Sequence, residues 1–255
     1  SNLNDICFSS LNQNFKYIDE NHEIVVGKSN NSNNDFDVII FASKKIEKVF
    51  IPSSIKKICS YAFSYCSCLK VVEFENNSQL KTIGKNAFSN TSIESISIPS
   101  SVEKIGKRTF SYCDSLKKLD ISLETKLGEK VFDGIPCLEL SENIDRIPNN
   151  LFNGNTSLTQ FHFPPTIKTI GIRAFSGCIN LREIKIPETI NFIDKGAFSG
   201  CTSLTKIEIM KSITSIEDDL FENCSNLSEV VIPPTITVIG KSAFKNCTSL
   251  TELII

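Results

Sequence analysis

The sequence predicts an α/β repeat protein, a solenoid of about nine coils with short parallel strands on one face and irregular or short helical returns on the other. Two observations predict this class. Ala-Phe, or a close variant, recurs every 20 to 25 residues, and apolar residues follow each pair at the same offsets. A fixed period of this length is the signature of repeat architectures. The recurring phenylalanines are Phe63, Phe88, Phe110, Phe132, Phe152, Phe175, Phe198, Phe221 and Phe244.

Each repeat ends in a stretch that alternates apolar and polar residues, as in Ile207-Glu208-Ile209. This alternation is the period of a half-buried β-strand. A proline often follows, as at Pro187 and Pro233, and ends the strand because it lacks a backbone donor. The segments Ile-x-x-Ile and Ala-Phe-x-x-Cys-x-x-Leu keep steps of three and four residues, which suit tight or helical turns. Such a coil cannot bury its apolar face alone, so the coils must stack.

These residues together follow the pattern P-x-x-I-x-x-I-G-x-x-A-F-x-x-C-x-x-L-x-x-I-x-I over about residues 52–255. The pattern resembles the BspA-like leucine-rich repeat, also called the Treponema-type repeat. The resemblance implies a leucine-rich-repeat solenoid, in a family whose members are typically bacterial or protist surface proteins implicated in adhesion, although some are intracellular. The glycine position holds Gly84, Gly106, Gly171 and Gly240, and the cysteine position holds Cys66, Cys113, Cys178, Cys201, Cys224 and Cys247.

Two repeats depart from the pattern. The repeat around Phe132 is shortened and has Ile135 near the place of the cysteine. The repeat around Phe152 has Asn155 there, and Pro148 where glycine is usual. We therefore expect a local kink near residues 122–155.

Both ends of the chain lie outside the regular pattern. Residues 1–51 do not fit the repeat, and residues 24–26 and 38–41 predict two strands of a β-hairpin around a polar loop. The sequence thus predicts an N-terminal capping segment over 1–51 and the solenoid over 52–255.

The chain stops on apolar residues at a repeat boundary, Leu253-Ile254-Ile255. This predicts either a solenoid truncated at its C-terminal end or end-to-end self-association through the uncapped coil.

The composition disfavours nucleic acid and membranes as partners. The chain has 27 basic and 29 acidic residues and a formal net charge of −2, so it has no long-range attraction for phosphate or anionic lipid. No run approaches the roughly 20 apolar residues that span a bilayer, so no membrane insertion is expected in this segment. Residues 1–10 show no basic segment followed by an apolar run, so they predict no signal peptide.

The sequence predicts no enzyme, no cofactor and no metal site. The only histidines are His22 and His162, and the repeats offer no single cluster of Ser, His and Asp for a triad. No glycine-rich phosphate loop is present, and Asp218-Asp219 reads as a solvated turn. The repeated cysteines are interpreted as small buried apolar residues, because no CxxC pair exists. A disulfide remains the alternative for the cysteines outside the repeat position, Cys7, Cys59, Cys68 and Cys137.

The outward positions of the strands should form the concave face of the solenoid and are the predicted protein-binding site. One row of these positions is acidic at first and becomes apolar near the C-terminus, which favours a basic or mixed partner surface. The row consists of Glu73, Ser97, Asp120, Glu139, His162, Lys185, Glu208, Val231 and Ile254.

The main functional hypothesis is a protein-binding module at the cell surface or secreted, which serves adhesion or recognition of a host or matrix protein. The alternative is a cytoplasmic scaffold or regulatory subunit that recruits an enzyme such as a phosphatase.

Overall fold

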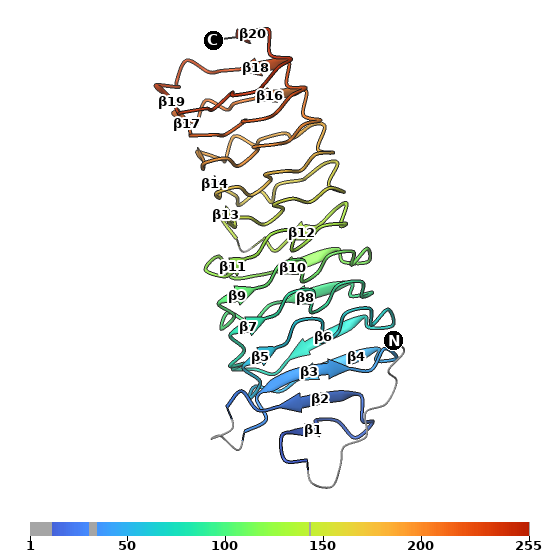
Figure 1. The fold of residues 1–255 in the computed structure, drawn as a ribbon. Coiled ribbons are helices and arrows are strands. Elements are labelled where there is room, and N and C mark those ends of the chain that lie inside the picture. Colours follow the sequence, from blue (N-terminus) through green and yellow to red (C-terminus); the bar gives the residue numbers. More distant parts are fainter. Residues whose placement is uncertain (1–11, 31–34, 143, 255) are drawn as a thin grey trace. The chain divides into compact units, whose positions relative to one another are not determined.

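A computed structural model describes residues 12–30, 35–142 and 144–254 and shows short β-strands in successive coils (Figure 1). The chain forms two compact units, residues 1–128 and residues 129–255. The division falls within residues 122–155, where the repeat is irregular in sequence. The kink expected there stays a prediction. Each unit contains two ladders of strands and one stack of turns.

The first ladder consists of the strands that the alternation of apolar and polar residues predicted, one from each coil. In unit 1, β4 pairs in parallel with β6, and β8 pairs in parallel with β10. In unit 2, β16, β18 and β20 form one parallel sheet. The middle residue is buried and its neighbours are exposed, as with Ile96 between Ser95 and Ser97. These strands confirm the prediction; their bounds are Lys48–Ile51 (β4), Val71–Phe74 (β6), Ser95–Ser97 (β8), Lys118–Asp120 (β10), Glu139–Leu140 (β12), Lys206–Glu208 (β16), Glu229–Val231 (β18) and Glu252–Ile254 (β20).

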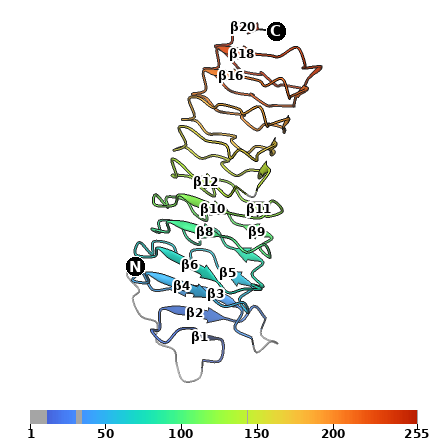
Figure 2. The same cartoon turned by 180° about the vertical axis from the view of Figure 1, so that it is seen from behind.

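The second ladder lies where the sequence predicted turns. The second isoleucine of Ile-x-x-Ile, or its equivalent, falls in a two-residue strand that pairs in parallel with the same position of the next coil, as Ile58 does with Ile83. Figure 2 shows β5, β9 and β11 of unit 1 following one another apart from β4, β6, β8 and β10. The bounds are Lys57–Ile58 (β5), Thr82–Ile83 (β7), Lys104–Ile105 (β9), Lys126–Leu127 (β11), Arg146–Ile147 (β13), Thr169–Ile170 (β14), Phe192–Ile193 (β15), Ser215–Ile216 (β17) and Val238–Ile239 (β19).

The Ala-Phe segments form the turns, and they are not helical. Alternate backbone N–H groups point to the next coil: the amides of Tyr61, Phe63 and Tyr65 donate to the carbonyls of Lys85, Ala87 and Ser89 at 2.8–2.9 Å. No helix occurs in the residues that the structure describes, so none there could cross a membrane. The α/β class and the helical returns were therefore wrong. The repeat is a β-solenoid, because alternate N–H groups of each turn bond to the next coil and those between them close tight turns within the coil.

Two residues of every turn have a left-handed backbone, and they lie four positions apart. They bracket the buried Ala-Phe pair or its variant. The first position holds Tyr61, Asn86, Arg108, Lys130, Asn150, Arg173, Gly196, Asp219 and Ser242, and the second holds Tyr65, Asn90, Tyr112, Gly134, Gly154, Gly177, Gly200, Asn223 and Asn246. In unit 1 the turns lie in segments 59–66, 84–91 and 106–113, which together form the turn edge of that unit.

The N-terminal segment contains three strands. β2 (Ile24–Gly27) pairs antiparallel with β3 (Val38–Ala42), at the two places where the sequence predicted strands. β1 (Phe15–Tyr17), which the sequence reading missed, pairs antiparallel with β2. β3 also pairs in parallel with β5, so it begins the second ladder. A capping role for this segment stays a prediction, as does a domain boundary between residues 51 and 52.

The core of each unit is a row of stacked phenylalanine rings. In unit 1 the Phe63 and Phe88 rings lie 4.9 Å apart, and the Phe88 and Phe110 rings lie 5.4 Å apart and nearly parallel. In unit 2 the rings from Phe152 to Phe244 follow one another at 5.3–5.8 Å. Nearly all of these side chains are inaccessible to solvent. Each buried ring contributes on the order of 2–3 kcal/mol, and offset stacking between rings adds to this.

Where a coil has glycine at the repeat's glycine position, the backbone of the preceding coil approaches closely. A Cβ on Gly106 would lie 2.5 Å from the backbone nitrogen of Lys85 and 2.8 Å from the carbonyl carbon of Gly84. Gly177 differs, because its φ is +73° and a Cβ there would meet Gly154 at an ordinary 3.4 Å. Asn223 and Asn246 occupy the equivalent position with similar φ.

We expect Gly106→Ala to destabilise the protein by about 2–3 kcal/mol, because rigid backbone must move to admit the methyl group. Gly177→Asn should change stability by less than about 1 kcal/mol, since asparagine tolerates this conformation. Thermal and urea unfolding of both variants tests this pair. Equal loss in the two variants, or no loss in Gly106→Ala, would contradict the close-approach explanation.

Candidate functional site

The described side chains of the predicted binding row are exposed except that of Val231, which is half-buried. Glu73, Ser97 and Asp120 point outward from β6, β8 and β10 of unit 1. In unit 2, Glu139 and Glu208 are exposed on β12 and β16, and Val231 is half-buried on β18. His162 and Lys185 are exposed but lie outside any strand, and Ile254 lies within β20. The strands thus hold row members side by side within each unit.

Contacts between coils offset part of the row's charge. The Glu73 carboxylate accepts a hydrogen bond from the Lys48 ammonium at 2.9 Å. The Ser97 hydroxyl donates to the Asp120 carboxylate at 2.9 Å. These side chains are exposed, so such pairs add little to stability, but they fix where the carboxylates lie.

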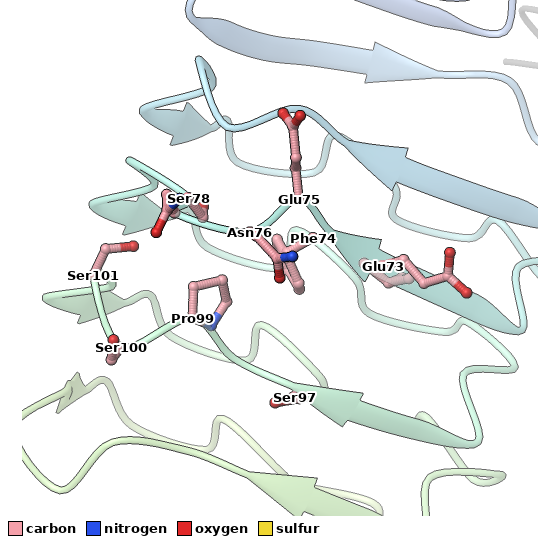
Figure 3. Close-up of a pocket in the computed structure, with 11 residues that line it drawn as sticks. Glu73, Phe74, Glu75, Asn76, Ser78, Ser97, Pro99, Ser100 and Ser101 are labelled. Carbon is pink, nitrogen blue, oxygen red and sulfur yellow. The ribbon is translucent and has the colours of Figure 1, made fainter.

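A cavity of about 480 Å³ opens beyond the ends of β6 and β8 in unit 1 (Figure 3). Glu73 and Ser97 of the predicted row belong to its lining. Val72 and Phe74 of β6 also line it, and the segments that follow the two strands contribute Glu75, Asn76, Asn77, Ser78, Pro99, Ser100 and Ser101. The loop after β6 belongs to the longest repeat, in which 25 residues separate successive phenylalanines. This longer spacing indicates extra residues in the loop, but the sequence analysis did not use it to place a loop there.

Glu75 anchors the loop. Its carboxylate accepts the backbone N–H of Ser53 at 2.7 Å. This hydrogen bond lowers the pKa of Glu75 below its usual value, so the group is charged at neutral pH. Figure 3 shows this carboxylate pointing away from Ser97 and Pro99, so Glu75 holds the loop to the preceding coil and places its charge beside the cavity.

Unit 2 has a matching cavity of about 470 Å³ at the ends of β16 and β18. Glu208 and Val231 of the predicted row line it, together with Met210, Pro233 and Pro234 from the connecting segments. Its lining is more apolar than that of the unit 1 cavity. Sequence reasoning found the strand residues at both places and missed the connecting loops.

The residues considered for chemistry are dispersed. No group of three or more His, Cys, Asp or Glu side chains gathers within residues 12–30, 35–142 and 144–254. The His22 ring lies 4.6 Å from the Tyr17 ring in the N-terminal segment. Cys59, Cys68 and Cys137 are free thiols, and Cys7 lies outside the described residues.

The repeated cysteines hydrogen-bond between coils. The thiols of Cys178, Cys201 and Cys224 donate to the carbonyl oxygens of Phe152, Phe175 and Phe198 at 3.1–3.2 Å. Burial raises the pKa of these thiols and brings that of Cys224 to about 12. They are thus protonated donors, and the interpretation as buried apolar residues left out this hydrogen bond.

Three repeats have another residue at the cysteine position, namely Thr91, Asn155 and Ile135, and Ile135 has no side-chain donor. The Thr91 hydroxyl donates to the carbonyl of Phe88 at 2.9 Å, within its own coil. The Asn155 amide donates to the carbonyls of Phe132 at 2.8 Å and Ile135 at 3.0 Å, and its oxygen accepts two backbone N–H groups. Asn155 is fully buried, so every polar atom of its side chain needs such a partner.

The family model for the BspA type leucine rich repeat region, with six copies, matches residues 35–145 and 145–255. The chain belongs to this family. The match begins before residue 52, in agreement with the pairing of β3 and β4 into the two ladders. No curated protein matches the chain.

Solved structures resemble this BspA-type chain at low identity. A leucine rich cell surface protein from Faecalibacterium prausnitzii is 23% identical over 82% of this chain and 79% of its own, with a TM-score of 0.43. A leucine rich repeat protein from T. pallidum is 23% identical over 86% of each chain, with a TM-score of 0.41. The pneumococcal vaccine antigen PcpA is 20% identical over 82% of this chain and 79% of its own, with a TM-score of 0.34. At this level of similarity the family assignment depends on the repeat model alone.

We expect Asn155→Leu to destabilise the protein by about 3 kcal/mol, because two backbone N–H groups lose their acceptor and the carbonyls of Phe132 and Ile135 lose the amide donor. Asn155→Cys should lose clearly less, since cysteine at this position of the BspA-type repeat bonds the same carbonyl of the preceding coil. Urea unfolding midpoints of the two variants provide the test. If both variants lost the same stability, the inter-coil hydrogen bond would not be the cause.

Thiol reagents should separate the cysteines of the native protein. At about pH 8, Cys68 and Cys137 should react quickly because they are exposed. Cys178, Cys201 and Cys224 should react only after denaturant is added, since they are buried and protonated. Mass spectrometry of digested, labelled protein measures this; rapid labelling of Cys201 in the native state would contradict its place in the core.

Proposed function

We propose that the chain is a non-enzymatic protein-binding module that holds its partner on the exposed strand row and the cavities beside it. The observation that carries this proposal is the shared geometry of the two units. In each, outward residues of adjacent strands, Glu73 with Ser97 and Glu208 with Val231, line a cavity between coils. Leucine-rich-repeat families are generally protein-interaction modules, which supports binding rather than catalysis.

The chemistry of the row favours a partner surface with basic and apolar parts. Glu73, Asp120 and Glu208 present exposed carboxylates, while Val231 and the prolines after β18 offer apolar contact. Complementary charge increases the rate of association and selects the partner.

We further propose that the partner is a host or matrix protein and that binding serves adhesion at the cell surface, as the resemblance to the BspA-like adhesion family implies.

Binding should be measured on immobilised extracellular matrix and on intact host cells. We expect Glu73→Lys combined with Asp120→Lys to weaken binding about fivefold or more, with a larger effect at low salt. The reason is that both substitutions place positive charge on the row that faces a basic surface.

The matched control is Glu103→Lys combined with Glu124→Lys, which changes the net charge equally at exposed positions outside the strand row. It should bind like the unaltered chain. Equal weakening in both double variants would show a general charge effect and remove the site from the strand row. Absence of binding to matrix and host cells would overturn the adhesion proposal.

A further inference from the structure

Three of the four tyrosines in the chain lie on the turn edge of unit 1. Tyr61, Tyr65 and Tyr112 are 52%, 67% and 50% exposed. All three have a left-handed backbone, with φ between 58° and 64°. Their rings therefore add little to the core, and their backbones occupy a region that bulky residues avoid.

The fold does not require tyrosine at these positions. Four consecutive coils of unit 2 have glycine at the second left-handed position, and the last two have asparagine. A residue with a Cβ costs on the order of 1–2 kcal/mol in this conformation, and asparagine offsets part of that cost through its short polar side chain. Three exposed aromatic residues are thus retained against the local preference of the backbone, which points to contacts outside the chain.

The charge around the tyrosines is positive. The turn edge, segments 59–66, 84–91 and 106–113, contains Lys85, Lys107 and Arg108 and no carboxylate; Asp114 follows directly after the third segment. The Lys85 ammonium lies 5.8 Å from the centre of the Tyr61 ring. Next to the edge, the Lys44 ammonium donates to the carbonyl of Ser64.

The polar groups of the edge are not fully satisfied within the described chain. Asn86 Oδ1 and Arg108 Nε are buried there without a hydrogen-bond partner. They occupy the same left-handed position in adjacent coils: Asn86 lies in the coil after that of Tyr61, and Arg108 lies in the coil of Tyr112. A partner that covers the edge would strengthen the electrostatic field of this arginine by excluding water.

We infer that the turn edge of unit 1 is a second docking surface, which binds an acidic segment of a partner protein. Exposed tyrosine and arginine dominate binding hot spots, and tyrosine among serine and asparagine is the composition of protein-binding paratopes. The cations and the absence of carboxylates within the edge complement aspartate and glutamate. Three cations and a net chain charge of −2 give little of the field that tracks a nucleic acid backbone.

This surface is separate from the strand row, so the inference does not depend on the proposed function. The test begins with selection from a displayed library of random short peptides on the immobilised full chain. The enriched peptides should combine Asp or Glu with an apolar or aromatic residue. One such peptide, made synthetically, then serves as the probe for affinity measurements.

The decisive variant is Tyr61→Asn, Tyr65→Asn and Tyr112→Asn together. Asparagine is native at equivalent left-handed positions, so this triple variant should fold and melt no lower than the unaltered chain. It should lose affinity for the acidic peptide at least about tenfold. Lys85→Glu with Arg108→Glu should lose a similar factor, whereas Phe192→Asn, an exposed aromatic residue of unit 2, should lose none.

Several outcomes would overturn the inference. They are failure to enrich any peptide, enrichment of neutral or basic peptides, and unchanged affinity in the triple tyrosine variant. Heparin and single-stranded DNA are tested in parallel. Binding of either that requires the three tyrosines, without acidic peptide binding, would assign the edge to a polyanion of another class. The Glu73 and Asp120 double variant should keep the acidic peptide affinity, which separates this surface from the strand row.

Discussion

The structure depends on satisfying the backbone of the turns between coils. Each turn buries Ala-Phe or its equivalent, so the N–H and C=O groups beside these side chains cannot reach water. Alternate N–H groups donate to the next coil, and the left-handed residues on either side allow the chain to turn while doing so. The ladders β5–β7–β9 and β13–β14–β15 continue the same pairing on another side of the coil. Because many of the hydrogen bonds of a coil are made to its neighbours, a single coil has no stable fold of its own.

The cysteine of the repeat belongs to this hydrogen-bond network. The buried carbonyl of Phe175 accepts the backbone N–H of Cys178 in its own coil, and the Cys201 thiol supplies a second donor small enough to fit beside the stacked rings. Asn155 shows that a donor other than sulfur can bond the preceding coil from this position, and Ile135 shows that an apolar residue can also fill it. The high thiol pKa follows from the same burial, because a thiolate would be desolvated and could not donate. Redox chemistry is thus unnecessary to explain why the column is repeated.

The sequence predicted the features that arise from the pattern of apolar residues. Alternation around Ile207 placed the strand face, and the period placed the phenylalanine and cysteine columns in the core. The second ladder was missed because two-residue strands such as Ile58 and its neighbour have no period of their own; their pairing comes from the next coil. The helical returns were wrong for a related reason, since steps of three and four residues suit successive turns as well as a helix. The loops beside Glu73 and Glu208 depend on how adjacent coils end, which a single repeat does not encode.

Repeat proteins make a useful internal comparison, because equivalent positions in different coils face the same backbone requirement. At the second left-handed position, Gly177 and Gly200 meet that requirement with no side chain, and Asn223 meets it with a short polar one. Tyr65 and Tyr112 meet it with a large, partly exposed ring, although glycine or asparagine occupies the same position in every coil of unit 2. Sequence periodicity alone cannot reveal this contrast, since φ is not visible in a pattern of residue types. Once the backbone is known, equivalent positions of different coils can be compared. A residue with an unfavourable left-handed backbone, where other coils have glycine or asparagine, indicates a contact with a partner outside the chain.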